Sequence, residues 1–389
     1  MAKSITKRTL VGFRDVSVNT RYFENLLHQI TDRPEKFIDK IRKGQSYWKA
    51  NNNNNMKFNA IVGNPPYQVM DGGTDRGAVP VYHNFVRISK RLCADYISMI
   101  MPARWYAGGR GLDSFRKEML NDERMSVLVD FETSKNLFPS VSIAGGLCYF
   151  LWSTKNKDLC TVINSSSETA KIMRRNLNDF DTFIRSNAAI TIIKKINKIT
   201  TSFLNEKVLS INPFGFRTYF RGRKNKTQGD IKILTSAGWS YIKRTDVGKN
   251  KELIDKYKIL VGRFVPSNGE LNVKPGEGYR VITTPQVLKP EEINSETYID
   301  VAVFDSEIEA LNYVSYLHTK FARFLLRQSI SSVNVTKECF SFVPNQDFKF
   351  DSDIDWSEPV SVIDDQLFTK YSLSSNEIEH IKYMIKPLK

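Results

Sequence analysis

The stretch Phe58-Asn59-Ala60-Ile61-Val62-Gly63-Asn64-Pro65-Pro66-Tyr67 indicates the fold class of this chain. Its first half is short and apolar and ends in glycine, a pattern that is typical of a buried strand. Each of the two prolines fixes its own backbone and restricts the residue before it, so the strand must end in a stiff loop. In α/β folds, loops at the carboxyl ends of strands are where ligands bind.

Helix-like and strand-like segments alternate after this loop. Apolar residues at helical spacing predict helices over 82–92, 112–120 and 188–199, and continuous apolar runs predict strands over 96–101, 127–130 and 146–152. This alternation predicts an α/β unit with a mostly parallel, buried sheet.

The composition divides the chain of 389 residues into four expected regions. Residues 1–55 are expected to be a helical segment that ends in an exposed loop of five asparagines, and residues 56–155 to be the α/β unit. Residues 156–204 are polar and are expected to connect this unit to a second, α+β domain over 205–389.

The formal net charge of +15 favours a polyanionic partner, although a merely soluble basic protein would show it too. The stretch 216–226 carries cations interleaved with aromatic residues and contains no acidic residue. It is a candidate for contacts to DNA phosphates and bases; a solvated face over core aromatics is the alternative. The candidate DNA-binding residues are Arg217, Tyr219, Arg221, Arg223, Lys224, Lys226, Arg263 and Lys337.

Several other classes of protein are not indicated. The four cysteines and four histidines are dispersed, so we expect no metal site. The sequence contains no apolar run of about 20 residues and no recognisable secretory signal, and we therefore expect a cytoplasmic protein without a membrane span.

The Asn64-Pro65-Pro66-Tyr67 loop suits one kind of chemistry. The exocyclic amino group of adenine is a weak nucleophile, because its lone pair is delocalised into the ring. An asparagine side-chain oxygen and a rigidly held proline carbonyl can accept both N–H groups and favour tetrahedral geometry at the nitrogen. The base would have to be flipped out of the duplex and held on an aromatic face, which is the role expected of Tyr67.

The segment 58–68 resembles catalytic motif IV of the gamma-class N6-adenine DNA methyltransferases of type II and IIG restriction–modification systems. Residues 97–105 resemble the strand and loop that follow, residues 136–143 with 146–152 resemble motif VIII, and residues 363–371 resemble the end of these enzymes.

The resemblance implies a partial Rossmann-like methyltransferase sheet and a C-terminal α+β target-recognition domain over 205–389. It implies that Asn64, Pro65, Pro66 and Tyr67 are catalytic and that Phe138 stacks on the flipped adenine opposite Tyr67. S-adenosylmethionine is the implied methyl donor and double-stranded DNA the implied partner.

The family's Phe-x-Gly-x-Gly cofactor loop is not found before motif IV. Residues 108–111 offer glycines between a strand and a helix, but they lie too far from the strand end to match a dinucleotide-binding loop. The chain could be one subunit of a split enzyme, a fragment, or a catalytically inactive DNA-recognition subunit. In each case we expect it to bind the methyl donor weakly or not at all by itself. The sequence contains no convincing nuclease motif, so a fused nuclease is not indicated. RNA, or a glutamine side chain of a protein, is an alternative substrate.

Overall fold

The computed structural model describes residues 30, 33–42, 58–69, 78–92, 94–106, 111–140, 143, 145–165, 170–265, 278–330 and 334–388. The chain divides into two compact units, of which one contains Met1–Phe131 and Leu147–Phe183, and the other Glu132–Gly146 and Ile184–Lys389. The asparagine run, Gly108 and Gly109, and most of the expected helical segment 1–55 lie outside the described residues.

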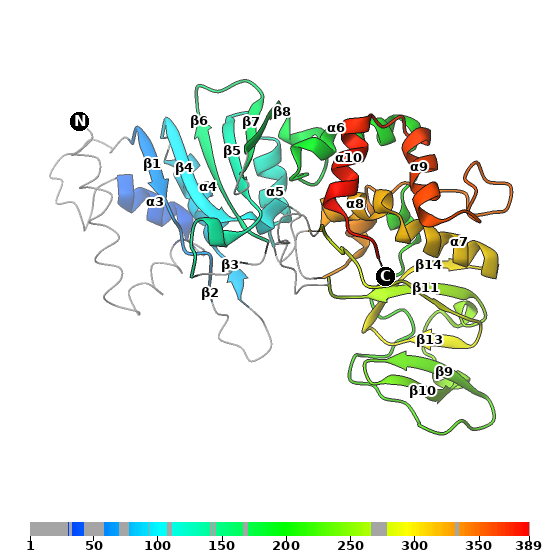
Figure 1. The fold of residues 1–389 in the computed structure, drawn as a ribbon. Helices are drawn as coiled ribbons and strands as arrows, with labels where there is room; N and C mark the ends of the chain where they lie inside the picture. Colours follow the sequence, from blue (N-terminus) through cyan, green and yellow to red (C-terminus); the bar gives the residue numbers. More distant parts are fainter. Residues whose placement is uncertain are drawn as a thin grey trace. The chain divides into compact units, whose positions relative to one another are not determined.

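A six-stranded mixed sheet forms the first unit, in the order β1-β4-β6-β5-β7-β8 (Figure 1). Its strands are β1 (Ala60–Gly63), β4 (Tyr96–Pro102), β5 (Met125–Phe131), β6 (Leu147–Ser153), β7 (Cys160–Ser165) and β8 (Ala170–Arg175). In this described sheet only β1–β4 and β5–β7 are parallel pairs, so the expectation of a mostly parallel sheet is wrong. The reason is β6, which returns antiparallel between β4 and β5 without a crossover helix.

One face of this sheet packs against helices. The alternating residues Ile97, Met99 and Met101 of β4 are buried in one core with residues of α4 (Tyr82–Arg91) and α5 (Asp113–Leu120). A further helix, α3 (Pro34–Arg42), packs on α4. The predicted helices over 82–92 and 112–120 are therefore confirmed, and α3 lies within the segment 1–55 that was expected to be helical.

The opposite face of the sheet carries exposed apolar side chains. Val62 of β1 is 62% exposed, and Tyr96 of β4 and Tyr149 of β6 are each 39% exposed. Among the described strands, β1 pairs with β4 alone and forms the edge of the sheet. This short, uncharged edge presents backbone donors and acceptors to which another strand could pair.

The sheet extends beyond the residue at which the sequence indicated its end. Strands β7 and β8 lie within the stretch expected to be a connector, because Cys160 and Val162 bury their side chains in the same core. The helix predicted over 188–199 is confirmed as α6 (Asn187–Ile199), in the second unit. The functional boundaries of the four regions stay a proposal.

The second unit combines two three-stranded sheets with helices (Figure 1). One sheet has the order β10-β9-β13 and the other β12-β11-β14. Their strands are β9 (Asp230–Thr235), β10 (Gly238–Lys243), β11 (Tyr257–Gly262), β12 (Gln286–Leu288), β13 (Glu292–Asn294) and β14 (Tyr298–Phe304). The helices that follow are α7 (Glu307–His318), α8 (Lys320–Ser329), α9 (Val360–Lys370) and α10 (Ser375–Met384). The predicted fold class, an α/β sheet unit followed by an α+β part, is confirmed.

Among the described residues, no helix is both long and apolar enough to span a membrane.

Candidate functional site

The Asn64–Tyr67 loop is held at both ends. It leaves β1 directly after Gly63 and leads into β2 (Gln68–Val69). This two-residue strand pairs antiparallel with β3 (Val79–Pro80). The Val81 backbone N–H also donates to the Tyr67 carbonyl, at 3.1 Å. A side chain built on Gly63 would meet no atom within 4 Å, so the space beside the strand end is open.

The four residues of the loop differ in exposure. Asn64 is exposed, Pro65 is buried, and Pro66 and Tyr67 are half-buried. The buried proline anchors the loop, while the amide side chain of Asn64 stays accessible. This is the arrangement that an acceptor for an incoming amino group requires.

The hydroxyl of Tyr67 is buried and has no hydrogen-bond partner among the described residues. Burial, and to a smaller extent the thiol of Cys148, raises the pKa of Tyr67 above its usual value. Cys148 itself is buried in the sheet core, where it accepts a hydrogen bond from Trp105 Nε1 at 3.4 Å. The Tyr67 phenol therefore stays neutral, and its hydroxyl is a polar group without a described partner.

The strand register shows that the carboxyl ends of three strands lie at the same end of the sheet. Gly63 of β1 pairs with Met99, and Pro102 at the end of β4 pairs with Leu147. Leu147 also pairs with Phe131, the last residue of β5. The chain therefore leaves β1, β4 and β5 at the same end of the sheet.

The segment 132–146 is packed within the second unit. Glu132 accepts hydrogen bonds from Arg327 Nη2 at 2.8 Å and from the Tyr279 hydroxyl at 2.8 Å. The Arg327 guanidinium also lies over the Tyr279 ring, 3.8 Å from its centroid. At the other end of the segment, Arg185 Nη1 donates to the Gly145 carbonyl at 2.6 Å.

Within this segment Phe138 is half-buried, and its backbone N–H donates to the Ser134 carbonyl at 2.8 Å. The buried Ser134 hydroxyl accepts the Ile143 N–H at 2.9 Å and so closes the loop. The sequence reading missed Glu132, Arg327 and Tyr279. No local pattern could have indicated a pair whose members are separated by 195 positions.

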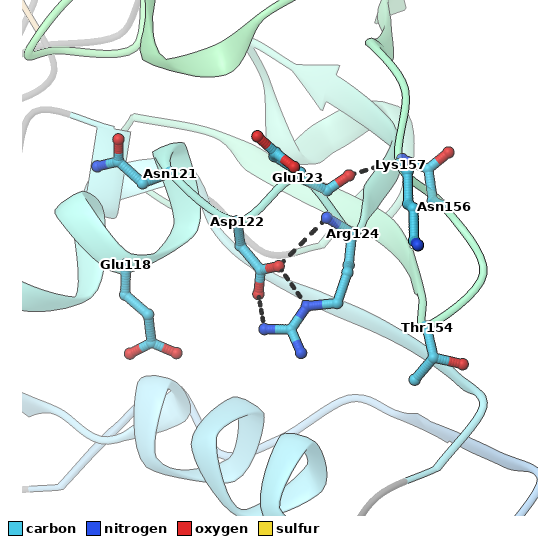
Figure 2. A pocket seen from close by; sticks show the side chains of 8 residues that line it. All are labelled: Glu118, Asn121, Asp122, Glu123, Arg124, Thr154, Asn156 and Lys157. Carbon is cyan, nitrogen blue, oxygen red and sulfur yellow. Dashed lines mark hydrogen bonds and ion pairs between the residues drawn. The ribbon is translucent and has the colours of Figure 1, made fainter.

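A cavity of ≈650 Å³ lies where β5 begins and β6 ends, and Figure 2 shows the side chains that line it. It is lined by Glu118, Asn121, Asp122, Glu123, Arg124, Thr154, Asn156 and Lys157. Burial alone would raise the pKa of Asp122, but hydrogen bonds from Arg124, Lys90 and Trp152 outweigh it and hold the pKa well below its usual range. The charge of Asp122 is thus already satisfied inside the protein, and we assign this cavity no role in the Asn64 site.

The basic stretch 216–226 forms an exposed loop before β9. It makes one isolated β-bridge, between Arg223 and Tyr241, and forms no described strand. The backbone turns here, because the Phe220 N–H donates to the Arg217 carbonyl at 2.9 Å, while Phe216 and Phe220 pack on the core of the β9 sheet. The six predicted DNA-binding residues of this stretch are all exposed: Arg217, Tyr219, Arg221, Arg223, Lys224 and Lys226.

The cations of this loop fall into two groups. Arg217 pairs with Glu296 at 3.1 Å, and Arg223 pairs with the buried Asp230. Lys224 and Lys226, in contrast, make no ion pair within the described part of the chain. Arg217 and Arg223 thus help to shape the loop, Arg221 is held by the carbonyls of Thr218 and Phe220, and the two lysines are the cations left for an external anion.

The other two predicted DNA-binding residues are linked to the same surface through the backbone. Arg263 is half-buried and Lys337 is exposed. The Val335 N–H donates to the Arg263 carbonyl at 2.8 Å, and the Arg263 N–H donates to the Thr297 carbonyl at 3.4 Å. Glu296, next to Thr297, holds Arg217. We call the surface formed by 216–226, Arg263 and Lys337 the basic ribbon.

The comparisons with known proteins concern mainly the first part of the chain. Residues 1–138 match the model of a family described as Eco57I restriction-modification methylase. A stretch of 124 residues is 36% identical to an uncharacterized adenine-specific methylase of Mycoplasma pneumoniae, and it covers 31% of this chain and 29% of that protein.

Two solved restriction enzymes resemble the chain only weakly. The type IIG restriction endonuclease BpuSI is 13% identical, with a TM-score of 0.32, over 83% of this chain and 52% of its own. The type IIL restriction-modification enzyme MmeI, solved with DNA, is 8% identical, with a TM-score of 0.39, over 85% and 55%.

The chain spans under a third of the length of its methylase relative and about half of each of these two structures. The family match includes the Asn64–Tyr67 loop. Residues 1–138 of this chain are therefore similar to the Eco57I restriction-modification methylases, and the resemblance inferred from the motifs is confirmed.

Proposed function

We propose that this chain contributes the target-base half of an N6-adenine DNA methyltransferase of a restriction–modification system. The observation that carries the proposal is the Asn64–Tyr67 loop. It lies at the carboxyl end of β1, with an exposed amide on a buried proline anchor, inside the stretch that is similar to the methylase family.

In the proposed mechanism Asn64 and Pro65 hold the amino group of a flipped adenine. The Asn64 side-chain oxygen and the Pro65 carbonyl accept its two N–H bonds and favour tetrahedral geometry at the nitrogen. Pro66 restricts the backbone of Pro65, so this carbonyl needs little reorganisation during the reaction. Tyr67 and Phe138 are proposed to stack on the two faces of the base.

The methyl donor implied by the family is S-adenosylmethionine, which would supply an electrophilic methyl group. The described residues do not fit a site for it, because no strand among them leads through a Gly-x-Gly turn into a helix. We therefore assign the donor site to another segment or subunit. The edge strand β1 supports this assignment, because Val62 is exposed and one side of β1 pairs with no other described strand, so a further strand could pair there.

The proposed partner of the basic ribbon is double-stranded DNA. Its segments belong to the second unit and are linked by backbone hydrogen bonds, and Lys224 and Lys226 are the cations proposed to contact phosphates. We propose residues 205–389 as the target-recognition domain and residues 56–155 as the catalytic half. Residues 1–55 and 156–204 are the proposed N-terminal segment and connector.

A DNA-recognition subunit without catalysis is the second candidate, and the lack of a donor site among the described residues favours it. The experiment that separates the two supplies the chain, alone and with a co-expressed cofactor-binding subunit, with labelled S-adenosylmethionine and unmethylated DNA. The first proposal expects transfer to adenine N6 in the reconstituted mixture, and loss of that transfer in Asn64→Ala with DNA binding retained. Transfer that survives Asn64→Ala contradicts the mechanism, and DNA binding without any transfer supports the second candidate.

A further inference from the structure

The basic ribbon contains a tight turn, Arg217–Phe220, which we call the recognition turn. The Phe220 N–H donates to the Arg217 carbonyl at 2.9 Å and closes it. Tyr219 lies at its tip, with 79% of its surface exposed. The turn thus displays a large aromatic side chain almost wholly to solvent.

The base of the recognition turn is anchored in the protein. The Phe216 and Phe220 rings contact each other with their centroids 4.6 Å apart and their planes tilted by 47°. Both pack on the apolar core that includes Ile231 and Ile242. Because these rings flank Tyr219 on both sides in sequence, core packing fixes the two ends of the turn.

Polar contacts hold the turn from its sides. Glu296 accepts from Arg217 Nη1 at 3.1 Å and from the Thr218 hydroxyl at 3.2 Å. Burial alone would raise the pKa of Glu296, but the hydrogen bonds from Thr218 and Arg217 outweigh it and lower the pKa, so the carboxylate stays charged.

Arg221 closes the other side. Its Nη1 donates to the carbonyls of Thr218 and Phe220, at 2.8 and 3.0 Å, and to Ser236 Oγ at 3.0 Å. Ser236 Oγ in turn donates to the Thr218 carbonyl at 3.0 Å. Charged and polar groups on both flanks therefore hold the backbone beneath Tyr219, and little entropy would be lost when the ring binds.

We infer that Tyr219 is a base-contacting tip, which enters a groove of double-stranded DNA while Lys224 and Lys226 contact the flanking phosphates. The inference rests on the proposed function and adds to it a division of roles within the basic ribbon. A rigid aromatic with a polar end suits contact with bases, and the lysines beside it carry the charge that phosphates need. An acidic protein surface would match the lysines equally well, but binding to it would not depend on base sequence, which the selection experiment below measures.

The division of roles predicts different salt dependences for two sets of variants. The measurement is fluorescence anisotropy of the full chain with a labelled random-sequence duplex of about 30 base pairs, titrated over a series of salt concentrations. Tyr219→Ala should weaken binding about tenfold at every salt concentration, because contact with base edges in a groove contributes a free energy that does not depend on salt. The Lys224→Ala, Lys226→Ala double variant should lower the slope of log affinity against log salt by about 2.

Tyr383 on α10 provides a matched control, because it is also a tyrosine of the second unit and is 63% exposed. Tyr383→Ala should bind DNA as the unaltered chain does, and Tyr219→Phe should keep most of the affinity through its ring. Equal affinity of Tyr219→Ala and Tyr383→Ala, within twofold, would overturn the inference and leave the proposed function standing. If the unaltered chain binds no duplex even at low salt, both fail.

Selection from a random duplex pool tests base contact directly. The sequences retained by Tyr219→Ala should lose the preference at one or two adjacent positions that the unaltered chain shows, whereas the lysine double variant should retain the same sequences more weakly. Identical preferences for the unaltered chain and Tyr219→Ala would overturn the assignment. The melting temperature of Tyr219→Ala should match that of the unaltered chain, because so little of Tyr219 is buried.

Discussion

Replacing Glu132 with glutamine should destabilise the second unit, because it removes the charge that Arg327 is buried against. The side chain of Arg327 is only 3% exposed, and that of Glu132 is 32% exposed. Burial alone would raise the pKa of Glu132, but the charges of Arg327 and Arg185 and the hydrogen bonds from Arg327 and Tyr279 lower it from 4.5 to about 2.

The size of the effect follows from this pKa. A fall from 4.5 to about 2 corresponds to about 3 kcal/mol of stabilisation of the charged form. Because nearly a third of the Glu132 side chain is exposed, solvent screening reduces our expectation to about 2 kcal/mol. The lost stability should appear in the segment 132–146 and in α8, which carry the two partners.

The pH dependence has a defined sign. The folded pKa of Glu132 lies below the unfolded value, so its stabilisation is fully present above about pH 4.5 and is lost as the pH falls toward 2. More than half of the difference between the unaltered chain and Glu132→Gln should therefore disappear between about pH 6 and pH 3.

The assay is urea unfolding followed by hydrogen–deuterium exchange and mass spectrometry, which reads the two units separately. Asp365→Asn is the control, because its ion pair with Lys382 is exposed on both sides and should contribute less than about 0.5 kcal/mol. If Glu132→Gln costs no more than Asp365→Asn, or if the cost is the same at pH 6 and pH 3, the reasoning is refuted.

Three further predictions concern single residues. Tyr67→Phe should leave the stability of the first unit unchanged or raise it by up to about 1 kcal/mol, because it removes a buried hydroxyl without a described partner; a loss above that size in urea unfolding contradicts it. Gly222→Ala should destabilise the basic ribbon by about 1–3 kcal/mol, because Gly222 has a φ of +70° and a Cβ would lie 2.4 Å from Ser240 Oγ; an unchanged melting temperature argues against this. Asp122→Asn should cost the first unit about 1–3 kcal/mol above pH 4, with the difference shrinking as the pH falls, because a lowered pKa stabilises only the charged form; a constant difference across pH in thermal unfolding contradicts it.

Much of the first unit could be predicted from the sequence. Helices α4, α5 and α6 and strands β1, β4, β5 and β6 lie where the periodicity placed them, because burial of one face imposes its spacing on neighbouring residues. The position of Asn64–Tyr67 after a strand was predictable for the same reason, since prolines act on their immediate neighbours. The placing of β6 between β4 and β5 was not, because strand order depends on pairing between distant segments.

The candidate sites divide along the same line. The sequence by itself determined the stiff loop with its exposed acceptor and the basic composition of 216–226, because both are properties of consecutive residues. Only the tertiary structure decided which cations are already paired. It places Glu132 against Arg327, and it places Glu296 against Arg217 in the recognition turn. These pairs join residues that are 79 and 195 positions apart in the sequence. Because the energy of an ion pair depends on the distance in space between the charges, only the fold determines which charges pair.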